Sequence, residues 1–119
     1  MLEPTMFDRY LSLMDPDGVV LRKVSIRFSS PYVVKEYGDE GADWSVDLQI
    51  LGLADANSCK SYQAIQVDSL GALISALWTA GEFIRHSEPY NAGQLFWLEP
   101  GDNCGLPEFT GRPYVAPTT

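Results

Sequence analysis

The chain has 119 residues, of which 45% are hydrophobic and 20% charged, so it can bury the core of a single domain spanning residues 1–119. Sixteen acidic against eight basic residues give a net charge of −8, which excludes nucleic acid as an expected partner because phosphate binding relies on clustered Lys and Arg. No apolar run reaches the ~20 residues of a membrane-spanning helix and the start lacks the order of a secretory signal, so we expect a cytoplasmic protein without membrane contact.

The segment from Arg9 to Phe28 is predicted to be a β-hairpin. Turn-forming residues at 15–18, Asp-Pro-Asp-Gly, separate two stretches in which polar and apolar side chains alternate. In the second stretch Val24 and Ile26 would face a core, with the period of two of a half-buried strand. Residues 5–14 also fit the apolar stripe of a short helix, and of the two interpretations we favour the strand.

The next segment, Ser29 to Asp43, is predicted to be a connection and the most mobile loop, extended around Tyr32 to Val34, because it mixes one proline and two glycines with charges. The clearest strand pattern of the chain follows at residues 44–51, where Trp, Val, Leu and Ile alternate with polar residues. After a polar loop at residues 54–58, residues 60–67 return beside it. These two strands form a second predicted hairpin.

A long helix is predicted from Asp68 or Ser69, which would cap its first turn, to about Arg85. Its wide apolar stripe is expected to lie on the sheet, because the spacing of three and four residues is that of one helix face. The stripe comprises Leu70, Leu73, Ile74, Leu77, Trp78 and Ile84. His86 follows at the end of the helix, where a cationic side chain is favoured as a C-terminal cap.

A second flank of this helix carries small residues and almost no long polar side chains. It comprises Gly71, Ala72, Ser75, Ala76, Thr79 and Ala80, followed by Phe83. Small residues let another backbone approach closely, so we expect the flank to be covered. The simplest cover is the same helix of a second copy, which predicts a homodimer with the interface residues Ala72, Ala76, Thr79 and Phe83. Cover by the chain's own tail or N-terminal segment is the alternative.

The rest of the chain is expected to hold one more short strand at Gln94 to Pro100, with Phe96 or Trp97 buried, after a loop at residues 87–93. Three prolines beyond residue 105 predict an extended C-terminal arm. The predicted fold class is therefore α+β. An antiparallel sheet of about five strands, made of two hairpins and a final short strand, would carry one long helix packed on it.

No pattern in the sequence indicates a catalytic set, a cofactor or a metal site. Cys59 and Cys104 lie far apart without a metal-binding spacing, so both are expected to be free thiols. His86 is followed by Ser87 and Glu88, but adjacency in sequence does not make a nucleophile, base and orienting carboxylate. We therefore expect no catalytic residues, no cofactor and no bound metal.

Three stretches of the chain, "LSLMDPDGVVLRKVSI", "DWSVDLQILGL" and "YQAIQVDSLGALISAL", carry a family resemblance. They resemble a small bacterial family described only as a domain of unknown function, with a Trp-led strand ending in Gly-Leu and a D-S-L-x-A-L helix start. The resemblance covers Arg9 to Leu98, and Gly71 stands where a long residue such as Gln is expected. It implies a compact α+β domain of the kind found among accessory bacterial genes, and it implies no activity.

Two functions from different classes fit these observations. The first is a non-enzymatic protein-interaction module, such as an immunity-type or accessory protein, that presents an acidic surface to a basic protein partner. Six acids and no Lys or Arg lie between Glu36 and Asp55, a run that equally fits a solvated loop, and aromatic residues near it are typical of binding sites. The candidate partner-binding residues are Tyr32, Tyr37, Asp39, Glu40 and Asp43.

The second function is that of a small-ligand-binding protein or minor hydrolase with a pocket between the sheet and the Ser29–Asp43 loop. Its polar lining would consist of Asp43, Asp47, His86 and Cys104. No spacing in the sequence links these residues into a catalytic set, so this function ranks second.

Overall fold

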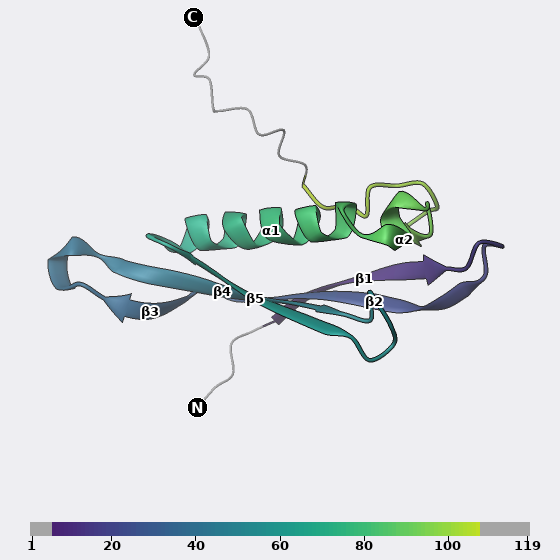
Figure 1. Cartoon of the computed structure of the whole chain (residues 1–119). Coiled ribbons are helices and arrows are strands. Elements are labelled where there is room, and N and C mark those ends of the chain that lie inside the picture. The colour runs from purple at the N-terminus through teal and green to yellow at the C-terminus, as the bar shows by residue number, and fades with distance from the viewer. Residues whose placement is uncertain (1–5, 108–119) are drawn as a thin grey trace, which may run out of the picture.

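The computed structural model describes residues 6–107 of the chain. These residues form an antiparallel sheet with one long helix packed on it, as the alternating side chains and turn residues of the sequence favour (Figure 1). The elements in chain order are β1 (Met6–Met14), β2 (Val20–Ser29), β3 (Tyr32–Glu36), the 3-10 turn η1 (Gly38–Glu40), β4 (Ala42–Leu51), β5 (Cys59–Gln66), α1 (Ser69–Arg85), α2 (Glu88–Asn91) and β6 (Leu95–Phe96). The predicted α+β class, with one long helix on an antiparallel sheet, is confirmed.

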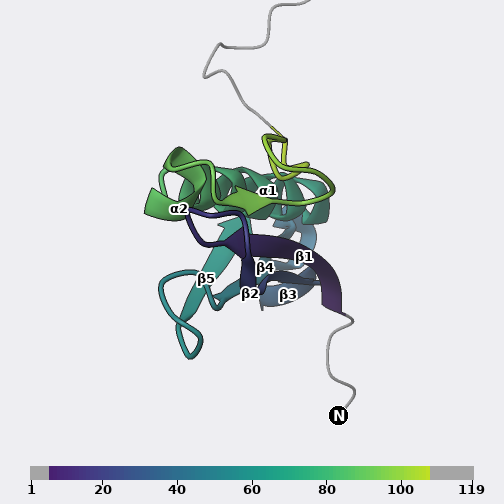
Figure 2. The ribbon, with the colours of Figure 1, turned by 90° about the vertical axis from the view of Figure 1, so that its right-hand side faces the viewer.

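β4 is the strand around which the six-stranded sheet is organised. One side of β4 pairs with β5 over residues 44–51. The other side pairs first with β3 and then, over residues 48–51, with β2. β1 lies beyond β2, and the short β6 pairs with β1 at Ser12 and Leu13. Figures 1 and 2 show α1 and α2 on the same face of this sheet, so within residues 6–107 the other face carries no α-helix.

The segment Ser29 to Asp43, expected to be a loop, contains a sixth strand and a tight hairpin. β3 pairs antiparallel with the first residues of β4, from Tyr32 opposite Ser45 to Glu36 opposite Ala42. The turn between the two strands is closed by the backbone N–H of Tyr37, which donates to the carbonyl of Gly41 at 2.8 Å. Pairing with β4 is a long-range contact, and it outweighs the local turn signals on which the sequence prediction rested.

Within the segment 5–14, the described residues 6–14 form a strand, as favoured, rather than a short helix. β1 pairs with β2 from Met6 opposite Ser29 to Met14 opposite Val20. The predicted turn follows, and the carboxylate of Asp15 accepts the backbone N–H groups of Asp17 and Val19, both at 2.9 Å. The hairpin is therefore held by the Asp-Pro-Asp-Gly turn chemistry read from the sequence.

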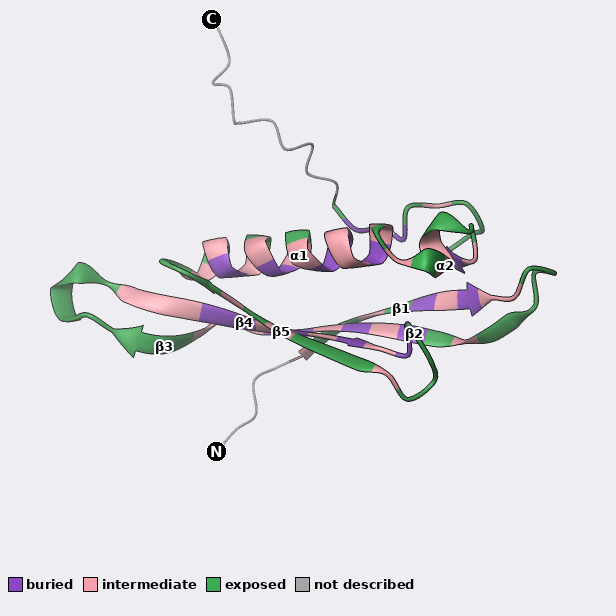
Figure 3. Ribbon diagram, viewed as in Figure 1, coloured by how far each residue is buried: buried purple, intermediate pink, exposed green. Residues whose placement is uncertain are grey.

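The helix α1 packs on the sheet through its small residues, so the predicted orientation of this helix is wrong. Ala72, Ala76 and Ala80 are fully buried, as is Ile84 of the expected stripe, and Leu73 and Leu77 are half-buried against the core, whereas Leu70, Ile74 and Trp78 of that stripe are exposed. The exposed fractions are 63% for Leu70, 44% for Ile74 and 45% for Trp78. Figure 3 shows the buried residues of α1 on the side that faces the sheet.

The physical reason for this orientation is that the sheet already fills the space below the helix. Val46, Leu48 and Ile50 of β4 project toward α1 and are at most 1% exposed. Methyl side chains let the helix backbone approach this layer closely, whereas large residues at the same positions would push it away. The buried core consists of Leu11, Leu13, Val24, Ile26, Phe28, Val46, Leu48, Ile50, Leu53, Ala72, Ala76, Ala80, Ile84, Leu95, Cys104 and Leu106.

The residues after β6 form a loop that closes one end of the core. Leu95 is the buried residue of β6, at 2% exposed, so the expectation that Phe96 or Trp97 is buried there is wrong. The guanidinium of Arg9 lies over the Trp97 ring, 3.7 Å from its centroid, and donates to the carbonyl of Gly105. The predicted C-terminal arm begins in this loop, and its part from residue 108 onward lies outside the described residues.

Asp102 holds this loop in shape. Its carboxylate accepts four backbone N–H groups at 2.8 to 3.1 Å, from Trp97, Leu98, Glu99 and Cys104. Desolvation raises the pKa of Asp102, but these four hydrogen bonds to the charged form outweigh it and lower the pKa from 3.8 to about 2. The ionised carboxylate is thus the form that fits the folded loop.

Asp102→Asn is expected to change how the stability of the protein depends on pH. Because the pKa of Asp102 is lower in the folded than in the unfolded chain, the carboxylate contributes stability that is present above its unfolded pKa and is lost as pH falls through about 2. Urea unfolding between pH 5 and 2 should show a shallower loss of stability in Asp102→Asn. Asp39→Asn, at an exposed acid, is the control, and an identical loss in both variants would contradict the prediction.

Candidate interaction surface

The outer side of α1 is an exposed apolar surface. Leu70, Ile74 and Trp78, which we call the α1 crest, follow one another at four-residue spacing and are all exposed. No charged side chain occurs from Ser69 to Gly81. The hydroxyl of Thr79 donates to the Ser75 carbonyl at 2.8 Å, so the helix satisfies this polar group itself. Surface helices of soluble proteins usually place charged residues on this side.

An apolar groove runs beside the crest, between α1 and the strands β1 and β2. A hollow of about 320 Å³ is lined by Phe7, Phe28, Ser30, Pro31, Leu73 and Leu77. A second hollow of about 250 Å³ shares Phe7, Phe28 and Leu77 with the first and continues to Asp8, Arg9, Gly105, Leu106 and Pro107. The two hollows are neighbours because these residues line both, and we call them together the α1 groove.

The crest and the groove form one surface. Leu73 lies three residues after Leu70, and Leu77 lies three residues after Ile74, a spacing at which side chains are neighbours on a helix. Phe7, on the opposite wall of the groove, is 57% exposed. A contiguous apolar surface of this kind is typical of a site that binds another protein.

Four of the five predicted partner-binding residues gather at the tip of the β3–β4 hairpin. These are Tyr37, Asp39, Glu40 and Asp43, and the hairpin projects past the first residues of α1 (Figure 1). The hydroxyl of Tyr37 donates to Asp43 Oδ2 at 2.7 Å, and this hydrogen bond raises the pKa of Tyr37. Within residues 6–107, none of the ion pairs involves the acids of this tip, which we call the acidic tip.

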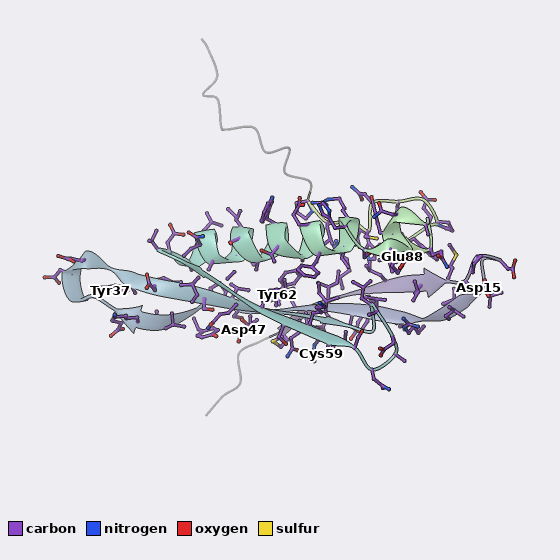
Figure 4. The ribbon with its side chains drawn as sticks, in the orientation of Figure 1. Asp15, Tyr37, Asp47, Cys59, Tyr62 and Glu88 are labelled. Carbon is purple, nitrogen blue, oxygen red and sulfur yellow. The ribbon has the colours of Figure 1, made fainter. Side chains whose placement is uncertain are left out.

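Tyr32, the fifth predicted residue, lies at the other end of β3 on the face of the sheet that carries no helix. Its hydroxyl donates to Asp47 Oδ1 at 2.7 Å and accepts the side-chain N–H of Gln63 at 3.2 Å. Figure 4 shows Asp47 on the side of the sheet away from α1. Tyr32 therefore belongs to a polar network on the open face and not to the acidic tip.

The residues of the predicted ligand pocket are not brought together by the fold. Asp47 lies on the open face of the sheet, whereas His86 caps the end of α1 as expected. Nε2 of His86 lies 2.9 Å from Glu82 Oε2, beside an apolar hollow of about 320 Å³ whose lining also includes Leu53, Phe83 and Ser87. This hollow contains neither of the two aspartates nor Cys104, so the proposed polar lining is wrong.

The two cysteines are free thiols, as predicted. Cys104 is fully buried, and burial followed by the nearby charge of Asp102 raises its pKa to about 11. The thiol is therefore protonated at neutral pH and is a poor nucleophile. No cluster of three or more His, Cys, Asp or Glu suited to a metal ion occurs within residues 6–107. None of the helices in the same range is both long and apolar enough to cross a membrane.

Two of the four predicted interface residues face the chain's own sheet. Ala72 and Ala76 are 0% exposed, so neither is accessible to a second copy. Thr79 and Phe83 lie on the flank of α1 next to β5, where the Phe83 ring packs 4.6 Å from that of Tyr62. The correction follows from the orientation of α1, because the small residues are those that the sheet accommodates.

Sequence reasoning missed the groove residues Phe7, Pro31 and Leu77 as candidates for binding. Their side chains come from β1, from the turn before β3 and from α1, so no local spacing links them. One signal was available in the sequence: the thirteen residues from Ser69 to Gly81 contain no charged residue. A helix with a single buried face normally carries charged residues on its other face, so this run indicates a second apolar face.

Residues 7–108 match the model of a family described as Domain of unknown function (DUF6968). Searches among curated proteins and among solved structures gave no match. The matched range contains the whole sheet from Phe7 onward, both helices, the α1 groove and the acidic tip.

Proposed function

The chain belongs to the DUF6968 family, a domain of unknown function, and from this premise we propose that it is a non-enzymatic protein-interaction module. The partner we propose is a basic amphipathic segment of another protein. Its apolar side chains enter the α1 groove, and its basic side chains face the acidic tip. An immunity-type or accessory protein that masks a basic partner would act in this way.

The observation that carries the proposal is the uncovered apolar surface on α1. Leu70, Ile74 and Trp78 expose about half of their surface, and the groove beside them is walled by Phe7 and Leu77. Full burial of an exposed large apolar side chain contributes about 1.5–3 kcal/mol, so a partner that covers these half-exposed side chains would gain about half of that for each one. Aromatic residues at such a surface, here Phe7 and Trp78, are those that most often dominate binding energy.

The charge of the protein favours a basic partner. The chain carries a net charge of −8. The acidic tip stands at the N-terminal end of α1, because Gln66, three residues before the helix, pairs with Trp44 at the base of the hairpin. In the groove itself Asp8 is paired with Arg27 at 3.0 Å, so the acidic tip supplies the unpaired acids. Complementary charge speeds encounter and selects partners, while the apolar contact supplies most of the affinity. A cytoplasmic location is part of this proposal and fits two cysteines that remain free thiols.

A labelled synthetic amphipathic peptide with Leu on one face and Lys on the other is the probe that tests this function. We expect it to bind the protein with an affinity that falls as salt is raised, and we expect the same peptide with Glu in place of Lys not to bind. Phe7→Ser should weaken binding about tenfold, because truncating an aromatic anchor costs more than about 1 kcal/mol. Fluorescence anisotropy measures both effects.

Leu21→Ser is the matched control for Phe7→Ser. Both side chains are 57% exposed, and Leu21 lies at the other end of the β1–β2 hairpin, outside the groove. Leu21→Ser should bind the Lys peptide as the wild type does. Equal binding of the Lys and Glu peptides, or equal weakening by the two substitutions, would refute the proposed function.

A further inference from the structure

β5 is an open edge of the sheet. Each of its eight residues pairs with β4, from Cys59 opposite Leu51 to Gln66 opposite Trp44, without a register shift. The other edge of β5 pairs with no strand within residues 6–107. Natural proteins blunt such edges with proline, bulges or charged side chains, especially Lys, because unpaired backbone groups attract another strand. β5 contains no proline, no bulge and a single charged residue, Lys60.

Above the middle of this edge the flank of α1 carries small side chains, whereas Phe83, farther along the helix, packs on Tyr62. A hollow of about 220 Å³ lies between β5 and the helix, and its lining consists of Leu48, Tyr62, Gln63, Ala64, Ile65, Ser75, Ala76 and Thr79. Ser75 and Thr79 are half-buried and form the helix side of this hollow. The edge therefore has room above it for the side chains of an additional strand.

We propose that a second copy of this chain pairs with the β5 edge. The two β5 strands run antiparallel about a twofold axis, so that the two sheets become one continuous sheet with both α1 helices on the same face. This interface goes beyond the proposed function, because it uses the β5 edge and leaves the α1 crest and the α1 groove free.

The spacing of the helices fits this arrangement. α1 lies over β4 and β5 alike, and neighbouring strands in a sheet are about 4.8 Å apart. Two helices placed symmetrically on the continuous sheet would thus be separated by about two strand spacings, ~10 Å, which is the upper end of the helix-packing range. Ser75 and Thr79 would face their twofold mates at this distance, where long polar side chains would not fit.

The sequence of β5 is self-complementary in this arrangement. With the twofold axis at Gln63, Tyr62 lies opposite Ala64 and Lys60 lies opposite Gln66. A large side chain then meets a small one on the helix side of the sheet, and the two lysines stay apart. β5 itself contains no acid, so no two acids face each other across the paired strands. These features favour a second copy over an unrelated strand as the occupant.

Light scattering tests the proposal. The wild-type protein at tens of micromolar should have about twice the 13.2 kDa mass of one chain. Ser75→Arg and Thr79→Arg place a long cation between the two helices and should give folded monomers, with unchanged circular dichroism. Ile74→Arg, on the α1 crest, is the matched control and should remain a dimer. Mild oxidation of the double variant Cys59→Ser, Gln63→Cys should give a covalent dimer across the twofold axis.

Three results would overturn the proposal. The first is a wild-type monomer at tens of micromolar. The second is a dimer that survives Ser75→Arg and Thr79→Arg but is lost in Ile74→Arg, which would place the contact on the crest. The third is the absence of a covalent dimer after oxidation of Cys59→Ser, Gln63→Cys. This result decides against the β5 edge even if both arginine variants misfold. Peptide binding measured on the same samples reports separately on the proposed function.

Discussion

Ala76→Arg is expected to leave the protein unfolded. Ala76 is 0% exposed and lies between α1 and the sheet, so an arginine there has no path to water. Overpacking a core costs about 1–3 kcal/mol, and a buried charge without a partner costs several kcal/mol more. The total reaches the lower part of the 5–15 kcal/mol by which domains are usually stable. Circular dichroism and urea unfolding should show the loss of the cooperative transition.

The matched substitution is Ile74→Arg, two residues earlier on the same helix. Ile74 is 44% exposed on the α1 crest, so its arginine reaches solvent and should change stability by no more than about 0.5 kcal/mol. The contrast between the two variants tests the orientation of α1 directly. If Ala76→Arg folded normally and Ile74→Arg did not, the large apolar stripe of the helix would have to face the sheet.

Leu48→Ala is expected to destabilise the protein by about 2–5 kcal/mol. Leu48 is 1% exposed at the centre of β4 and is part of the layer on which α1 lies, and its truncation removes buried methyl groups and leaves a cavity. The rigid sheet on one side and the alanine face of α1 on the other leave few side chains that can move in to fill the space. The urea midpoint should fall while the slope of the transition is unchanged.

Leu70→Ala is the control for this substitution. The same atoms are removed, but Leu70 is 63% exposed, so the expected change is within about 0.5 kcal/mol. A large effect at Leu70 in dilute solution, where Leu48 has a small one, would contradict the described core. If the two effects become similar only when the amphipathic peptide is present, Leu70 contributes to binding rather than to folding.

The two proposed surfaces occupy different sides of α1. The groove that would bind a basic partner lies on the β1 and β2 side, and the edge that would bind a second copy lies on the β5 side. The matched arginine substitutions at Ile74 and Thr79 therefore separate them. A dimer formed through β5 would carry two grooves, which would raise the apparent affinity for a partner with two basic segments.

Local signals in the sequence predicted most of the elements. The Asp-Pro-Asp-Gly turn, the alternation from Trp44 onward and the capping residue Asp68 each act within a few residues of the chain, so they can be read without knowing the fold. The carboxylate of Asp68 accepts the backbone N–H of Gly71, and α1 begins at Ser69 as predicted. The α+β class, the two expected hairpins and the long helix were determined in this way.

Only the tertiary structure decided which faces of these elements are buried. β3 exists because β4 offers it a partner, and the local glycines and Pro31 do not reveal this pairing. Periodicity identified two apolar sides on α1. Which side is buried depends on the space between the helix and the sheet, and the large side chains of Leu48 and its neighbours in β4 occupy most of that space. The helix therefore buries its alanines and exposes Leu70, Ile74 and Trp78, and the candidate binding surface lies on the face that the sequence assigned to the core.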